Sequence, residues 1–160
     1  MADLQTWTVT DPYVDSKCQL AEGPYYEKQT NTLRFLDIMG HRFHTINLNK
    51  GPSSLTTLQL DTPISVTADI AGVNPSEKIL IGAKYGLAVL DRKSGKYEYL
   101  AKLTKEPNKR LRGNDGAVDP HGRMWIGSMS DFDVDLQPEG KFFRSVGGEE
   151  GVMGKERSEG

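Results

Sequence analysis

The segment FLD at residues 35–37 is followed by LIG at 80–82 and by WIG at 125–127, so that an apolar pair returns every 45 residues. A polar turn precedes each pair, and a second strand-like run follows within about a dozen residues. A period near this length, with several short strands per unit, is typical of β-propeller blades, which contain about 40–50 residues in four antiparallel strands. The repeat predicts about three blades.

The rest of the chain also reads as strand and turn. Short runs rich in β-branched and aromatic residues alternate with turns rich in Gly, Pro, Asn and Asp, and no window carries a helical apolar stripe over three turns. The best strand candidates are 33–36, 44–48, 54–60, 64–70, 79–81, 87–90 and 97–103. The chain is therefore predicted to be all-β. Because a propeller closes with about four to eight blades, three blades predict an open, incomplete ring with exposed blade faces.

The composition changes close to residue 145. Residues 146–160 contain five Gly and four Glu, and no aromatic residue. Such a segment cannot bury enough apolar surface to offset its ordering entropy. We therefore expect a partial propeller over residues 1–145 and a disordered Gly/Glu-rich tail over 146–160. The same change leaves open the hypothesis of a truncated product.

Charge and composition exclude several classes of protein. Twenty Lys and Arg oppose 22 Asp and Glu, so the formal charge is −2 and a basic nucleic-acid module is excluded. No apolar run approaches the roughly 18 residues of a membrane span, and the start, MADLQTW, lacks the features of a signal peptide. We expect a cytoplasmic protein with no nucleic-acid or membrane partner. The single cysteine, Cys18, cannot form an intrachain disulfide; we expect it early in an inner strand, as a small buried hydrophobe.

Two further segments differ from ordinary strand or turn sequence: LAEGPYY at 20–26, and RGNDG at 112–116 with its continuation DPHGRMWIGSM at 119–129. Each precedes the second strand of a blade, where a propeller has its innermost strand. Together with LRFLDI at 33–38, these motifs closely resemble the SMP-30/gluconolactonase (regucalcin-like) family over about residues 16–144. The resemblance implies a propeller of six blades that binds a divalent cation at its channel mouth and hydrolyses sugar lactones. The resemblance identifies this chain with the N-terminal half of such a propeller.

The resemblance also assigns roles to individual residues. Glu22 matches the metal-binding glutamate of the first blade, and Asn114 is the second metal ligand expected in this chain. Arg112 and Asn114 match the pair that holds the substrate, and Asp131 falls near an acidic substrate contact. Oxygen donors suit Ca²⁺, Mg²⁺ or Mn²⁺, with Zn²⁺ left open. Such a cation would polarise the lactone carbonyl and acidify a bound water.

The family's remaining asparagine ligand and its catalytic aspartate belong to later blades and have no counterpart before Gly160. We therefore expect no catalytic residue in this chain, an incomplete site and no lactonase activity from the monomer. Without the resemblance, Glu22 would be a solvated residue before a Gly-Pro turn, and residues 114–116 an ordinary turn. Two alternatives stay open: a non-catalytic calcium- or metal-binding or assembly module that self-associates through exposed blade faces, or a truncated product without activity.

Overall fold

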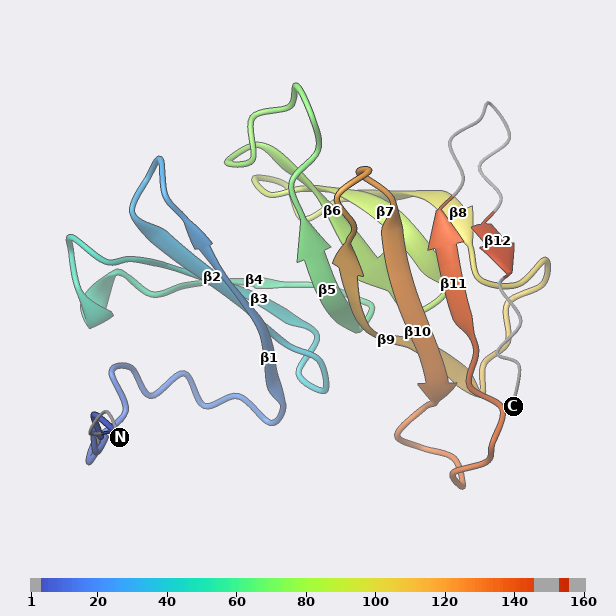
Figure 1. Ribbon diagram of the computed structural model, residues 1–160, viewed down its shortest axis with the longest axis horizontal. Coiled ribbons are helices and arrows are strands. Elements are labelled where there is room, and N and C mark those ends of the chain that lie inside the picture. Colours follow the sequence, from blue (N-terminus) through green and yellow to red (C-terminus); the bar gives the residue numbers. More distant parts are fainter. Residues whose placement is uncertain (1–3, 146–152, 156–160) are drawn as a thin grey trace.

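The computed structural model describes residues 4–145 and 153–155, which form three antiparallel four-stranded sheets (Figure 1). The first sheet contains β1 (Ala21–Glu27), β2 (Thr32–Asp37), β3 (Arg42–Asn47) and β4 (Thr56–Gln59). The second contains β5 (Ile64–Ala68), β6 (Lys78–Ala83), β7 (Gly86–Asp91) and β8 (Tyr97–Lys102). The third contains β9 (Leu111–Val118), β10 (Met124–Ser130), β11 (Phe142–Ser145) and β12 (Met153–Lys155). Strands neighbour one another in chain order, so each sheet is a meander.

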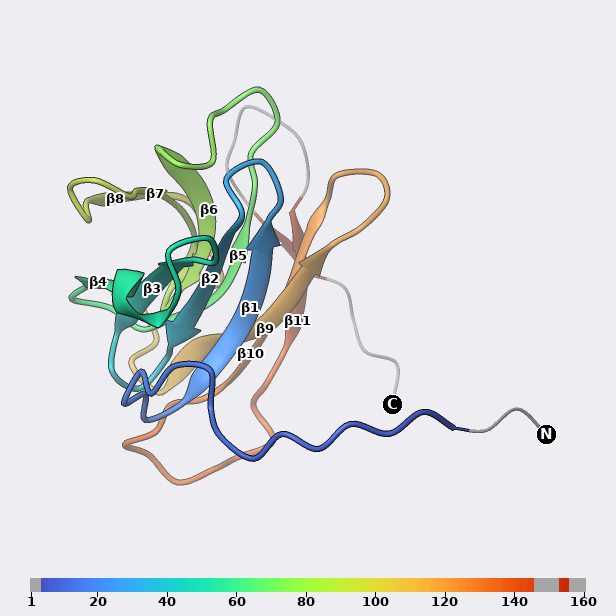
Figure 2. The same cartoon turned by 90° about the vertical axis from the view of Figure 1, so that its left-hand side faces the viewer.

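The first strand of each sheet lies on the inner side of the arrangement. Strand β5 contacts both β1 and β9. Figures 1 and 2 show that these three strands start at the same end of the molecule, where the chain also turns after β10. The FLD, LIG and WIG segments fall in β2, β6 and β10, the second strand of each sheet. The all-β class and the blade repeat are thereby confirmed.

Two apolar clusters hold the sheets together. The cluster between the first and second sheets includes Leu36, Phe43, Ile64, Ile81 and Leu90. The cluster between the second and third includes Val66, Leu87, Met124, Ile126 and Phe143. Alternation along each strand directs these side chains into the two interfaces. Each sheet is thus fixed against its neighbour in the chain, and the ends of the inner strands are held in place.

A buried ion-pair network adds to the interface between the first two sheets. Arg34, on β2, is 0% exposed, and its Nη1 donates to Glu27 Oε1 at 2.9 Å and to Asp69 Oδ1 at 2.7 Å. Arg92, which follows β7, also pairs with Glu27. Because Asp69 and Arg92 belong to the second sheet's segment of the chain, these charges link two blades.

Three local features differ from the sequence prediction. Ser54 was expected in a strand, which was wrong: it ends a turn of 3-10 helix, η1 (Pro52–Ser54), where proline fixes the first dihedral. Strand β12 pairs with β11 where the sequence predicted no element, while the rest of 146–160 lies outside the described residues. Cys18 lies ahead of β1 and is only half-buried, rather than buried in an inner strand. Within the described residues, no helix has the length and apolarity needed to cross a membrane.

Candidate functional site

Each of the three inner strands carries a β-bulge, with one residue more than the strand it pairs with. The bulge lies at Glu22–Tyr25 in β1, at Ser65 in β5 and at Gly113–Gly116 in β9. Bulges bend a strand, change the direction of its side chains and are over-represented next to active sites. The two predicted metal ligands, Glu22 and Asn114, both belong to bulged segments.

Ser65 lies between the bulges of β1 and β9. Gly23 has a φ of +57°, in the region that favours glycine, and a Cβ built on it would lie 3.8 Å from the Ser65 carbonyl oxygen. A Cβ on Gly113 would lie 3.2 Å from Ser65 Oγ, which donates to the Gly82 carbonyl oxygen at 3.2 Å. The two glycines thus allow the three inner strands to approach closely at this end. Sequence reasoning missed Ser65, because no motif marks it.

Arg112 and Asn114 contact each other at the bulge of β9. Arg112 Nη1 donates to Asn114 Oδ1 at 3.0 Å and to the Gly113 carbonyl oxygen at 3.0 Å. The same guanidinium lies 4.2 Å from the centre of the Phe132 ring. With 3% of its surface exposed, Arg112 offers little area to a ligand, and its clearest effect is to orient the Asn114 amide oxygen.

The charge of Arg112 lies in a largely desolvated position. Burial lowers the pKa of its guanidinium, and the Asp131 carboxylate opposes this effect. Asp131 follows β10 and forms an ion pair with Lys84, in the turn between β6 and β7. The Lys84 carbonyl oxygen accepts a hydrogen bond from the Gly113 amide at 3.2 Å. Asp131 and Lys84 therefore join the second and third sheets beside Arg112. Lys84 is a second residue that no sequence signal singled out.

Glu22 is exposed at the start of β1 and forms no ion pair within the described part of the chain. It makes no hydrogen bond to Asn114 there, because β5 lies between the two strands. The structure therefore brings Arg112, Asn114 and Asp131 together in the third blade. It brings Glu22 to the same end of the first blade, with β5 of the second blade between them.

The ligand atoms at this end can be compared with those that divalent cations prefer. Asn114 Oδ1 uses one lone pair on Arg112 and keeps the other, since an amide oxygen accepts two hydrogen bonds. A carboxylate and an amide oxygen are hard ligands of the kind preferred by Ca²⁺, Mg²⁺ and Mn²⁺, whereas structural Zn²⁺ sites favour nitrogen and sulfur. The residues therefore fit a hard divalent cation, to which this chain would contribute two protein ligands.

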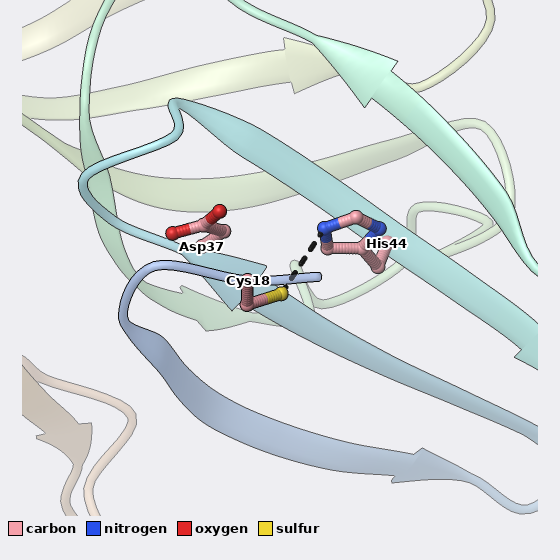
Figure 3. Close-up of side chains that lie close together, drawn as sticks. All are labelled: Cys18, Asp37 and His44. Carbon is pink, nitrogen blue, oxygen red and sulfur yellow. Dashed lines mark hydrogen bonds between the residues drawn. The ribbon is translucent and has the colours of Figure 1, made fainter. Parts of the chain in front are cut away.

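A second group of ligand-type side chains lies beside the start of β1, where Asp37 pairs with Ala21. It consists of Cys18, Asp37 and His44, with one ligand atom of each within 4.8 Å of the others (Figure 3). Cys18 Sγ lies 3.4 Å from His44 Nε2, and His44 Nδ1 lies 2.9 Å from Thr57 Oγ1. Burial lowers the pKa of His44, which favours the neutral imidazole. Thiol, imidazole and hydroxyl thus form one chain of contacts.

Asp37 is already fully engaged in this group. Its carboxylate accepts hydrogen bonds from the Arg42 guanidinium and from the backbone amides of Gln19, Leu20 and Gly40. Burial raises the pKa of Asp37, and these hydrogen bonds outweigh burial and lower it to about 2. A cation here would have to displace Arg42, so the group is better described as structural.

Comparison with known proteins points to one family. The family described as SMP-30/Gluconolactonase/LRE-like region matches residues 20–155. The cell growth-regulated gene 1 protein of Candida albicans is 39% identical over 141 residues, covering 79% of this chain and 42% of that protein. The 6-deoxy-6-sulfogluconolactonase of Pseudomonas putida is 29% identical over 110 residues, covering 69% of this chain and 35% of that enzyme.

A solved structure agrees with these relatives. The calcium-binding protein regucalcin from Agrobacterium tumefaciens superposes with a TM-score of 0.71 at 26% identity, covering 86% of this chain and 43% of that one. The chain therefore spans less than half the length of the proteins it matches. Since the family match extends over most of the described residues, the chain belongs to the SMP-30/gluconolactonase/LRE-like family.

Proposed function

We propose that the protein is a divalent-metal-dependent hydrolase of sugar lactones, and that this chain contributes Glu22, Arg112, Asn114 and Asp131 to its site. One observation carries the proposal: the bulged starts of β1 and β9 bring Glu22 and the hydrogen-bonded Arg112–Asn114 pair to the same end of the first and third blades, with β5 of the second blade between them. The names of the family and of the Pseudomonas relative support lactone hydrolysis, and the similarity to a calcium-binding regucalcin supports cation binding.

In this proposal Glu22 and Asn114 hold the cation, which supplies a Lewis acid for the lactone carbonyl and a more acidic water when bound. Arg112 acts as a positioning residue, because its Nη1 proton fixes the Asn114 amide oxygen. Its buried positive charge favours negative charge that develops nearby during acyl transfer, since a fixed charge is more effective where water is excluded. Asp131, held by Lys84, lines the adjoining pocket and in this proposal accepts hydrogen bonds from sugar hydroxyls.

A second candidate is a non-catalytic binding protein for Ca²⁺ or another divalent cation. It is favoured by the regucalcin similarity and by the small number of protein ligands that this chain contributes. Both candidates predict cation binding at Glu22 and Asn114. Only the first predicts that the cation accelerates lactone hydrolysis.

The test measures acid release from glucono-1,5-lactone by the purified chain with Mn²⁺ and with EDTA, alongside Mn²⁺ binding by calorimetry. We expect hydrolysis above the spontaneous rate, abolished by EDTA and carried by associated chains, because the monomer holds only part of the site. Glu22→Gln should weaken Mn²⁺ binding by about tenfold or more, since affinity depends on ligand charge. Glu98→Gln, an exposed change on β8, is the matched control and should leave both readouts unchanged.

The outcomes separate the two candidates. Hydrolysis that EDTA does not reduce would contradict metal dependence. Mn²⁺ binding at Glu22 without any hydrolysis would favour the binding protein. No binding at millimolar Mn²⁺ would overturn both.

A further inference from the structure

A cavity of about 610 Å³ opens beside the predicted site, at the same end of the blades. All three sheets contribute to it, through the turn 39–41 between β2 and β3, the linker 61–63, the turn 84–85, strand β8 and the loop 131–133. We call it the outer pocket and define it by Asp61, Lys84, Tyr85, Tyr97, Tyr99 and Asp131. Its volume lies in the range of small-molecule sites, about 300–1,000 Å³. Its inner end is Asp131, which the predicted site also uses.

Three half-buried tyrosines give the outer pocket aromatic walls. Tyr97 and Tyr99 lie two residues apart on β8 and pack edge to face, with ring centres 5.7 Å apart and an interplanar angle of 85°. Tyr97 Oη donates to Asp61 Oδ1 at 2.8 Å, and the Tyr85 amide lies 3.5 Å from Tyr99 Oη. These contacts hold the Tyr97 and Tyr99 rings in position before a ligand binds. An aromatic wall with hydroxyl tips matches a ring that has an apolar C–H face and hydroxyl edges, as a pyranose has.

The charges of the outer pocket discriminate between ligands. Asp61, Asp131 and Asp133 contribute three carboxylates, and Lys84 contributes one ammonium that Asp131 already pairs with. A phosphorylated or carboxylated ligand would meet uncompensated negative charge. An uncharged polyol would instead find acceptors on the carboxylates and donors on Lys84 and on the Tyr85 and Tyr99 hydroxyls.

We infer that the outer pocket is a subsite for an uncharged sugar unit, contiguous through Asp131 with the predicted lactone site. The choice of a sugar rests on the proposed function. The preference for an uncharged ligand rests only on the lining of the pocket. The substrate would then carry a neutral glycosyl or polyol group beyond its lactone ring.

The test titrates the ¹⁵N-labelled chain with methyl β-glucoside and with glucose 6-phosphate in the presence of EDTA, and follows the amide signals of residues 84–85 and 97–99. We expect saturable shifts with the methyl glucoside, and binding of the phosphate at least about tenfold weaker. Asp61→Asn should reduce the ratio of the two affinities by about fivefold, which is the effect of one charge at close range in water. Glu98→Gln makes the same charge change on the other face of β8 and should leave the difference unchanged.

Glucose 6-phosphate binding as tightly as the methyl glucoside, or an absence of shifts at these residues with both sugars, would overturn the inference. Tyr85→Leu removes one aromatic wall and should weaken the binding of methyl glucoside more than that of glucose 6-phosphate. If the tyrosine variant fails to fold, Asp61→Asn still tests the inference. Because EDTA removes the cation, sugar binding without lactone hydrolysis would contradict only the proposed function. Hydrolysis without sugar binding in the pocket would contradict only this inference.

Discussion

Replacing Arg34 by methionine should destabilise the joint between the first two blades. Arg34 is completely buried on β2, where it pairs with Glu27 and Asp69. Its Nε also donates to Thr67 Oγ1 at 2.9 Å, and its guanidinium lies 3.9 Å from the centre of the Tyr25 ring. Methionine fills similar apolar space but provides none of these polar contacts.

The size of the destabilisation depends on how far Glu27 and Asp69 remain compensated without Arg34. Breaking a buried ion pair by removing one partner costs about 3–5 kcal/mol, because the other charge is left without compensation. Glu27 keeps its ion pair with Arg92, and Asp69 has a side chain that is 40% exposed, so water can solvate it. We therefore expect the low end of the range, about 3 kcal/mol. With an m-value of about 2 kcal/mol/M, the urea midpoint falls by about 1.5 M.

Urea unfolding monitored by circular dichroism measures this change. The matched control is Arg123→Met, which removes an ion pair to Asp119 from a side chain that is 41% exposed and should cost less than about 1 kcal/mol. If Arg34→Met lowers the midpoint no more than Arg123→Met does, the network does not stabilise the interface and the reasoning is refuted.

Three further predictions concern the surroundings of the candidate site. Because hydrogen bonds lower the pKa of Asp37 from 3.8 to about 2, the ionised carboxylate stabilises the fold by about 2 kcal/mol above pH 4, and this stabilisation is lost as the pH falls toward 2. In Asp37→Asn the unfolding free energy should therefore vary less between pH 4 and pH 2, and a pH profile unchanged from that of the unaltered chain would contradict the lowered pKa of Asp37. Gly23→Ala should lower the unfolding free energy by about 1 kcal/mol, since φ is +57°, and should also weaken Mn²⁺ binding by moving Glu22. A loss of stability with unaltered Mn²⁺ affinity would show that the bulge does not position Glu22 for the cation. Cys18→Ala should leave Mn²⁺ affinity unchanged, because Arg42 occupies the carboxylate of the neighbouring Asp37, and a loss of affinity would place the cation at the cysteine.

The blade architecture could be predicted because it is repeated in the sequence. The apolar pairs at 35–36, 80–81 and 125–126 fall on the central strands β2, β6 and β10, whose alternating pattern is a local property of the chain. The end at Ser54 could not be predicted from alternation, because the preceding Gly51 and Pro52 set the backbone there.

The strand positions of the two site motifs could be predicted, whereas the contacts around them could not. The EGP and RGN segments lie on inner strands, as their position in the blades predicted. The bulges in these strands and the Arg112–Asn114 hydrogen bond were not predicted. The burial of Arg112 was not predicted, since it depends on Phe132 and other residues of the third sheet. Ser65 and Lys84 carry no signal, because their contacts exist only after two blades have packed.

The most direct test of the central claim is Mn²⁺-induced broadening of amide signals in the ¹⁵N-labelled full chain. A paramagnetic ion broadens nearby signals most strongly, so the affected residues locate it. We expect broadening of the amide signals of residues 22, 23 and 113–115, lost in Glu22→Gln and retained in Glu98→Gln. Broadening centred on Cys18 and His44, or the same pattern in Glu22→Gln as in the unaltered chain, would contradict a cation held by Glu22 and Asn114.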